Sequence, residues 1–191
     1  MARNKAFDEK EVLKKAMELF WGQGYEKTSM QDLVDHMGIH RRSIYDTFGD
    51  KRSLFLSSLA YYEEFVANEM KKILASELPA KQAVREVFEF ALNAAEHYPA
   101  GCLAVNTAVE LSLLDREIAE LSTRMFKDTE KLFGRLIEQG HASGELSKQL
   151  DPDSLSRFLH NNLLGIRVLI KTDYTKKELE SIIDVTLSVL D

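Results

Sequence analysis

Apolar residues recur along this chain with the 3.6-residue period of amphipathic helices, and no segment shows the two-residue alternation of a half-buried strand. The first predicted helix begins after an N-cap at Asp8 and is ended by the stretch 22–24, Gly-Gln-Gly. Its expected apolar face consists of Leu13, Ala16, Met17 and Phe20. All three prolines lie between periodic segments. The pattern therefore predicts an all-α protein of about nine helices.

Two short helices are expected next, each followed by a glycine. Thr28 or Ser29 caps the second helix, which ends at Gly38, and the third covers about 40–48. A long fourth helix follows Asp50, and five more are expected at roughly 80–97, 102–113, 115–140, 152–172 and 175–190. Two short helices joined by a glycine-containing turn are typical of a helix-turn-helix. We therefore expect a helix-turn-helix domain over 1–50 and a C-terminal helical bundle over 51–191.

The third predicted helix carries the residues best suited to contact DNA. With Ile44 and Phe48 turned inward, one exposed face holds Arg41, Arg42, Tyr45 and Asp46. Because a guanidinium fits the O6 and N7 atoms of guanine, we expect Arg41 and Arg42 to read bases. Asp46 is expected to accept from a cytosine amino group or to orient an arginine. The alternative is that both arginines are ordinary solvated charges.

Phosphate contacts are expected from hydroxyl, ammonium and helix-terminal groups near this face. The residues expected to make them are Thr28, Ser29, Ser43, Tyr45 and Lys51, and His40 is placed to touch either a base or a phosphate.

The net charge of −6 argues against nucleic acid until its distribution is considered. Residues 1–60 carry ten Lys and Arg against nine Asp and Glu, whereas residues 61–191 carry fifteen against twenty-two. The excess acidity thus belongs to the C-terminal part, and an N-terminal surface that faces DNA remains possible.

Residues 24–56, GYEKTSMQDLVDHMGIHRRSIYDTFGDKRSLFL, closely resemble the N-terminal region of TetR/AcrR-family transcriptional regulators. The residues that match the family pattern in order and spacing are Gly24, Tyr25, Thr28, Ser29, Gly38, Ile39, Ile44, Tyr45, Phe48 and Lys51. The departures are Val34 and Met37, which replace the usual alanines, the run 40–43, and Asp46. These departures bear on which operator is read.

The resemblance implies a homodimer that binds a palindrome-like operator in double-stranded DNA, as a repressor released by a small-molecule effector. The alternative is an effector-independent nucleoid or division factor of the same family. An enzyme is not expected, because the sequence lacks a phosphate-binding loop, a nucleophile motif and paired carboxylates. No cofactor and no metal site are expected. No apolar run is long enough for a membrane span, so we expect a cytoplasmic protein.

The resemblance also makes the C-terminal helices a sensor. Cys102, Asn106 and Glu110 form a row at four-residue spacing, which either lines a pocket or faces solvent. Cys102 is in a segment similar to that of electrophile or oxidant sensors of the family, and its alternative role is a small core residue. The other pocket candidates, for which core packing is the default, are Phe88, Leu92, Leu103, Phe126, Phe133, His160 and Asn161.

By the same resemblance, the last two helices are expected to form the dimer interface. Their apolar positions exceed what one face of each helix needs, and a four-helix bundle between two subunits would bury the surplus. The residues expected at this interface are Leu155, Leu159, Leu163, Ile166, Ile170, Leu179, Ile183 and Leu187. The two DNA-reading helices can then lie about one DNA turn, roughly 34–36 Å, apart.

Overall fold

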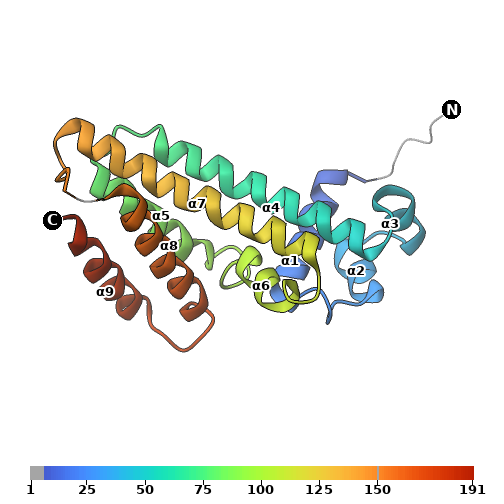
Figure 1. Ribbon diagram of the computed structural model, residues 1–191. Coiled ribbons are helices and arrows are strands. Elements are labelled where there is room, and N and C mark those ends of the chain that lie inside the picture. Colours follow the sequence, from blue (N-terminus) through green and yellow to red (C-terminus); the bar gives the residue numbers. More distant parts are fainter. Residues whose placement is uncertain (1–6, 150) are drawn as a thin grey trace. The chain divides into compact units, whose positions relative to one another are not determined.

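The computed structural model describes residues 7–149 and 151–191, and all regular structure in these ranges is helical. The elements are α1 (Glu9–Gln23), α2 (Met30–Met37), α3 (Arg41–Phe48), α4 (Lys51–Leu74), α5 (Ala80–Ala94), α6 (Leu103–Leu111), α7 (Arg116–Ser143), α8 (Pro152–Leu169), α9 (Lys176–Leu187) and the short 3-10 helix η1 (Ser188–Leu190) (Figure 1). The predicted all-α fold is therefore confirmed. None of these helices is long and apolar enough to cross a membrane.

The chain divides into two compact units, of which unit 1 ends at Val66 and unit 2 begins at Ala67. α4 contributes its first two-thirds to unit 1 and its last turns to unit 2. The boundary expected between residues 50 and 51 falls at the start of this helix, whereas the two compact units divide between Val66 and Ala67.

Unit 1 is held together by aromatic packing between α1 and the first part of α4. The ring of Phe20 meets that of Phe55 edge-on at 5.0 Å, and Trp21 meets Tyr62 in the same way at 5.0 Å. The buried face of α1 includes Val12, whereas Leu13, which the sequence pattern placed inward, is half-buried. The face is thus rotated slightly from the predicted one, because Trp21 extends it to one side.

The ends of the short helices in unit 1 are set by local hydrogen bonds. The Ser29 hydroxyl accepts from the backbone N–H of Asp32 at 3.1 Å, and the Asp32 carboxylate accepts from the backbone N–H of Ser29 at 2.8 Å. These bonds hold the pKa of Asp32 below its usual range. At the other end of α2, Gly38 has φ +72°, a left-handed conformation that glycine adopts without strain. α2 therefore begins and ends where the sequence predicts.

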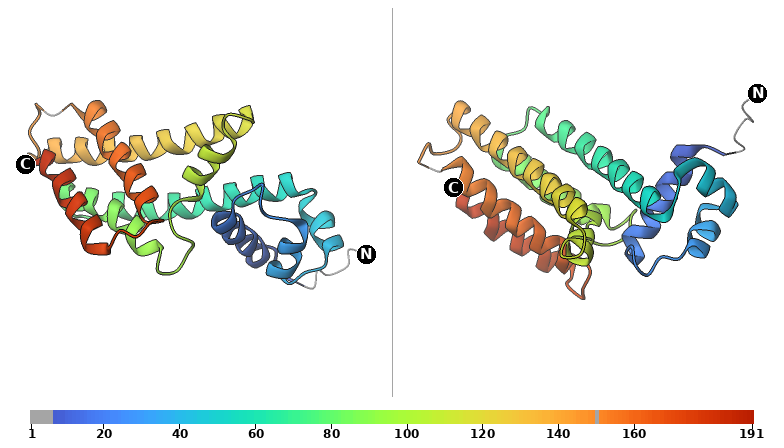
Figure 2. Two further views of the ribbon diagram at one scale, coloured as in Figure 1. Left: turned by 90° about the horizontal axis from the view of Figure 1, so that it is seen from below. Right: turned by 45° about the vertical axis from the view of Figure 1, so that its right-hand side comes forward.

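Unit 2 is a helical bundle in which α7 and α8 run antiparallel and side by side, with α5 and α9 against α8 (Figures 1 and 2). Its core is apolar, and the rings of Phe88 on α5 and Phe133 on α7 lie 5.9 Å apart between centroids. α5 has no side-chain cap of its own. The carboxylate of Glu145, beyond the end of α7, instead accepts from the backbone N–H groups of Ala80 and Lys81 at 2.5 and 3.0 Å.

Two glycines of α7 differ in what surrounds them, which gives a matched test of this packing. A Cβ atom at Gly140 would lie 2.6 Å from Leu146 and 2.8 Å from the Cβ atom of Ala80, whereas one at Gly134 would meet nothing within 4 Å. We expect Gly140→Ala to lower the free energy of unfolding by about 1–3 kcal/mol through overpacking. Gly134→Ala should raise it by about 0.5–1 kcal/mol, because alanine is the better helix former. Urea denaturation of both variants measures the two effects, and equal shifts would contradict the packing described.

Candidate nucleic-acid interface

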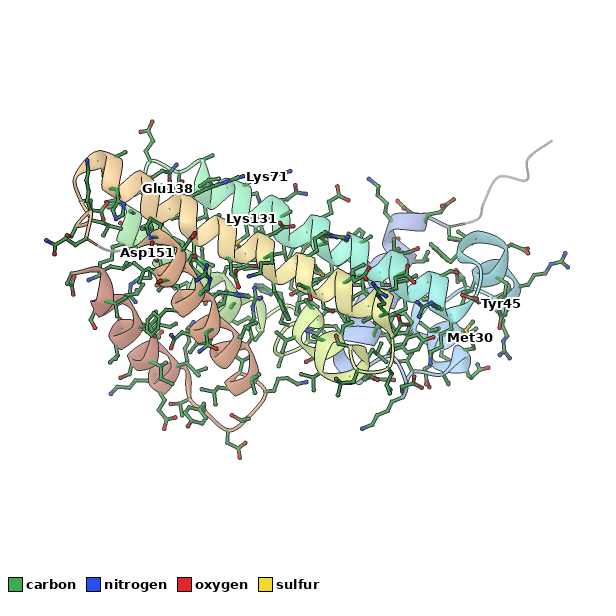
Figure 3. The ribbon with its side chains drawn as sticks, in the orientation of Figure 1. Met30, Tyr45, Lys71, Lys131, Glu138 and Asp151 are labelled. Carbon is green, nitrogen blue, oxygen red and sulfur yellow. The ribbon has the colours of Figure 1, made fainter. Side chains whose placement is uncertain are left out.

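The exposed face of α3 is the one that the sequence predicts. Ile44 is 0% exposed and lies in the core of unit 1, while Phe48 is half-buried. On the opposite side, Arg41, Arg42 and Asp46 are exposed, and the exposed fraction of Tyr45 is 45%. Figure 3 labels Tyr45 on α3. Unit 1 thus presents two guanidinium groups and a phenol within about one and a half turns of α3.

Asp46 lies beside one of the two arginines. Its Oδ2 atom is 3.6 Å from Nε of Arg42, four residues earlier, and both side chains are largely exposed. An exposed pair of this kind adds little to stability. It does restrict where the Arg42 guanidinium points, which is one of the two roles expected for Asp46. Arg41 has no carboxylate within ion-pair distance in the described part of the chain.

Thr28 does not lie where a phosphate contact needs it. Its side chain is 0% exposed, and its hydroxyl donates to the backbone carbonyl of Gly24 at 2.6 Å. The hydroxyl therefore closes the turn between α1 and α2 and offers no surface to a phosphate, contrary to the sequence-based expectation. The neighbouring Ser29 is exposed and caps α2.

The remaining predicted contacts surround α3. His40 is the exposed N-cap of α3, and its side chain makes no capping hydrogen bond. Ser43 is half-buried. The ammonium of Lys51 lies 4.4 Å from the centre of the Tyr25 ring, a cation–π contact at the first residue of α4. Just before it, hydrogen bonds from Ser53 hold the pKa of Asp50 below its usual range.

The residues expected to bind an effector are divided by the structure into three groups. Phe88, Phe133, Leu92, Leu103 and Cys102 are buried in unit 2. Phe126, Asn106 and Glu110 are half-buried, and Asn161 is exposed. The Lys171 ammonium donates to Oδ1 of Asn106 at 3.1 Å. The row of Cys102, Asn106 and Glu110 thus runs from the core toward the surface, and Asn161 lies on the outer side of α8.

His160 is the buried polar residue of this set. It is 3% exposed, its ring centre lies 5.7 Å from that of Phe126, and its Nδ1 atom is 3.7 Å from the Glu130 carboxylate. Burial and the nearby charge of Arg167 lower the pKa of His160 to about 4, although Glu130 acts in the opposite direction. The imidazole is therefore neutral at physiological pH.

The apolar residues expected at the dimer interface lie inside the chain itself. All of them except the half-buried Ile170 are buried against the rest of unit 2, namely Leu155, Leu159, Leu163, Ile166, Leu179, Ile183 and Leu187. Because they are buried within one chain, they offer little surface to a second copy. The outer face of α8 and α9 instead carries a shallow apolar groove, in which Phe158 is 42% and Val185 70% exposed.

Sequence reasoning missed two features of unit 2. Phe158 and Val185 are isolated apolar positions on otherwise polar helix faces, so the periodicity did not single them out. Arg167 is 6% exposed, although its charge favours the surface. No three His, Cys, Asp or Glu side chains gather at a metal-binding distance within the described ranges.

Comparison with known proteins matches both units. Residues 12–57 match the family described as bacterial regulatory proteins, tetR family, and residues 80–185 match the tetracyclin repressor-like C-terminal domain. The uncharacterised HTH-type transcriptional regulator YezE of Bacillus subtilis (strain 168) is 37% identical over 194 residues, covering 100% of both chains. The HTH-type transcriptional repressor ComR of Escherichia coli (strain K12) is 30% identical over 188 residues, covering 97% of this chain and 90% of the relative.

Among solved structures, a cysteine mutant of the TetR family transcriptional regulator CifR, complexed with 26-bp double-strand operator DNA, is similar with a TM-score of 0.90. It is 26% identical in sequence, and the match covers 100% of each chain. Together with the ordered match around α2 and α3 and the two domain matches, these similarities establish that the chain belongs to the TetR family of transcriptional regulators.

Proposed function

We propose that this TetR-family regulator is a repressor that binds a palindromic operator as a homodimer and leaves it when a small molecule binds unit 2. The observation that carries the proposal is the exposed face of α3 with Arg41, Arg42 and Tyr45. The repressor name of ComR and the operator complex of CifR support it by similarity. In this proposal residues 1–50 bind DNA, and residues 51–191 bind the effector and form the dimer. The protein acts in the cytoplasm, where its DNA is, and catalyses no reaction.

α3 is short enough to lie in a major groove with its N-terminal half against the bases. Arg41 forms no ion pair with a carboxylate of the described ranges, so its guanidinium is the best placed for a bidentate contact with guanine. Arg42 reads a base with its direction set by Asp46. Tyr45, Ser29, Ser43 and Lys51 hold phosphates through hydroxyl and ammonium groups, and His40 reaches either a base or a phosphate.

Dimerisation uses the outer face of α8 and α9. The exposed apolar side chains Phe158 and Val185 lie at the groove between these helices, with Ile182 and Val189 beside them. A second copy of the same face, related by a two-fold axis, would cover both residues and fill the groove. This assigns the interface to side chains that are free in one chain, unlike the buried leucines of the same two helices.

Substitutions on α3 test the DNA contacts. We expect Arg41→Ala to weaken binding to the DNA upstream of the native gene by about 1–3 kcal/mol, roughly fivefold to 150-fold, because a bidentate base contact is lost. Tyr45→Ala should weaken binding of all sequences alike, since a phosphate contact carries no sequence information. Fluorescence anisotropy with the native DNA and a scrambled duplex measures both effects.

Arg116→Ala is the matched control, because Arg116 is an equally exposed arginine at the start of α7 in unit 2. It should bind the native DNA as wild type does. If Arg41→Ala and Tyr45→Ala both bind with unchanged affinity, the assignment of α3 as the reading helix is wrong.

A charge placed on the outer face of α9 tests the dimer. Val185→Glu should yield monomers at micromolar concentration, because two carboxylates would be buried against each other across the two-fold axis. Val109→Glu on α6 is the control, since Val109 is 81% exposed outside the proposed interface. Analytical ultracentrifugation reports the mass of each variant. A Val185→Glu protein that sediments like Val109→Glu would rule out this face as the interface.

A further inference from the structure

Arg167 is an arginine inside the helical bundle of unit 2. It lies near the end of α8 and is 6% exposed, so almost all of its side chain is enclosed, unlike that of a surface arginine. No carboxylate of the described residues lies within ion-pair distance of it. Since a guanidinium stays charged at any pH that the protein meets, the chain carries a buried cation without a counter-ion.

Such a cation is costly unless something outside the chain compensates it. Removing a charge from water is unfavourable by several kcal/mol, and native proteins offset this with an ion pair or with several hydrogen bonds. Glu130, the carboxylate beside His160 on this side of α8, is already bound by the Lys127 ammonium at 2.6 Å. The structure therefore contains a position where an anion would be strongly favoured.

The helical geometry places this position between α7 and α8. Arg167 is seven residues after His160, which is two turns of α8 and the same side of the helix. Helical side chains lean toward the N-terminus, so the Arg167 head extends back toward His160. The charge of Arg167 also contributes to the lowered pKa of His160. Because α7 is antiparallel to α8 and Phe126 meets His160, the Arg167 head lies at about the level of Ser122 on α7.

The polar groups near this position also lack partners. The buried Nε2 atom of His160 and the buried hydroxyl of Ser122 have no hydrogen-bond partner in the described residues. The same holds for the hydroxyl of Thr107 on α6, a helix that packs against both α7 and α8. All three residues are more than nine-tenths buried. One buried cation and the two unsatisfied hydroxyl donors of Ser122 and Thr107, on three adjoining helices, match the needs of one oxyanion.

We propose that the effector of this regulator carries an anionic group, a carboxylate or a phosphate, which binds between α7 and α8 on the Arg167 guanidinium and accepts a hydrogen bond from the Ser122 hydroxyl. The half-buried ring of Phe126 beside His160 offers an apolar face to the rest of the molecule. The inference rests on the proposed effector control and adds its chemical class. An anion that binds here would link α8, which carries the proposed dimer face, to α7.

Thermal unfolding of the full chain tests the charge of the site without DNA. In a chloride buffer, Arg167→Met should unfold at a midpoint about 2–6 °C above that of wild type, because an apolar side chain of similar length replaces an uncompensated charge. Sodium benzoate and inorganic phosphate are the two probes, each compared with chloride at the same ionic strength. At least one should raise the wild-type midpoint by about 2–6 °C and leave Arg167→Met unchanged. A response to benzoate alone identifies a carboxylate, and a response to phosphate alone identifies a phosphate.

Arg157→Met is the matched control on the same helix, since Arg157 is exposed beside Asp153, and it should keep the wild-type midpoint and the response to the probe. Arg167→Lys keeps the positive charge but loses the planar guanidinium that can donate two parallel hydrogen bonds to an oxyanion. This variant should bind the active probe with at least tenfold weaker affinity. An Arg167→Met protein less stable than wild type, or a wild type that responds to neither probe, overturns the proposal.

Operator binding separates this inference from the proposed function. Arg167→Met should bind the native upstream DNA as wild type does and should no longer be released by the active probe. If no variant binds DNA, the repressor proposal fails while the midpoints still decide the anion site. If Arg167→Met binds the operator and is released from it by the probe as wild type is, the proposed anion site is wrong and the proposed repressor function is unaffected.

Discussion

The burial of Ile44 orients the surface that unit 1 can present to DNA. α3 has only eight residues, and Ile44 is its one fully buried side chain, so the packing of this isoleucine decides how the helix is rotated about its axis. Arg41 and Tyr45 point outward as a consequence. A helix of this length has little stability of its own in water, and its shape therefore depends on the core beneath it. The aromatic contacts of Phe20 and Phe55 supply that core.

Sequence alone predicted unit 1 well where local interactions decide the structure. Ser29 caps α2 through atoms three residues away, and Gly38 ends it through its own backbone, so both signals are contained in a few residues. Thr28 was misplaced for the opposite reason. Its hydroxyl can face a phosphate or the Gly24 carbonyl, and the packing of the whole turn, which no short pattern contains, directs it inward. The exposed face of α3 was predictable because Ile44 alone is apolar in its first turns.

In unit 2, the sequence predicted which helices exist better than what covers each face. The apolar stripes of α8 and α9 were real, but residues such as Leu159 and Ile183 are buried inside one chain. Arg167 shows the same limit, since an arginine between Ile166 and Val168 gives no sign that it is buried. The two faces of α8 thus differ. The inner face carries the buried charge of Arg167, and the outer face carries exposed apolar side chains such as Phe158.

In the proposed complex, two copies of α3 enter the major groove of one operator. Dimethyl sulfate footprinting tests it directly, because the reagent methylates guanine N7, the major-groove atom that an arginine would cover. On the DNA upstream of the native gene, we expect two protected guanine clusters whose centres are separated by about one helical turn, roughly 10 bp, or a whole multiple of it. A single protected cluster, or DNA bound with every guanine N7 still reactive, would contradict it.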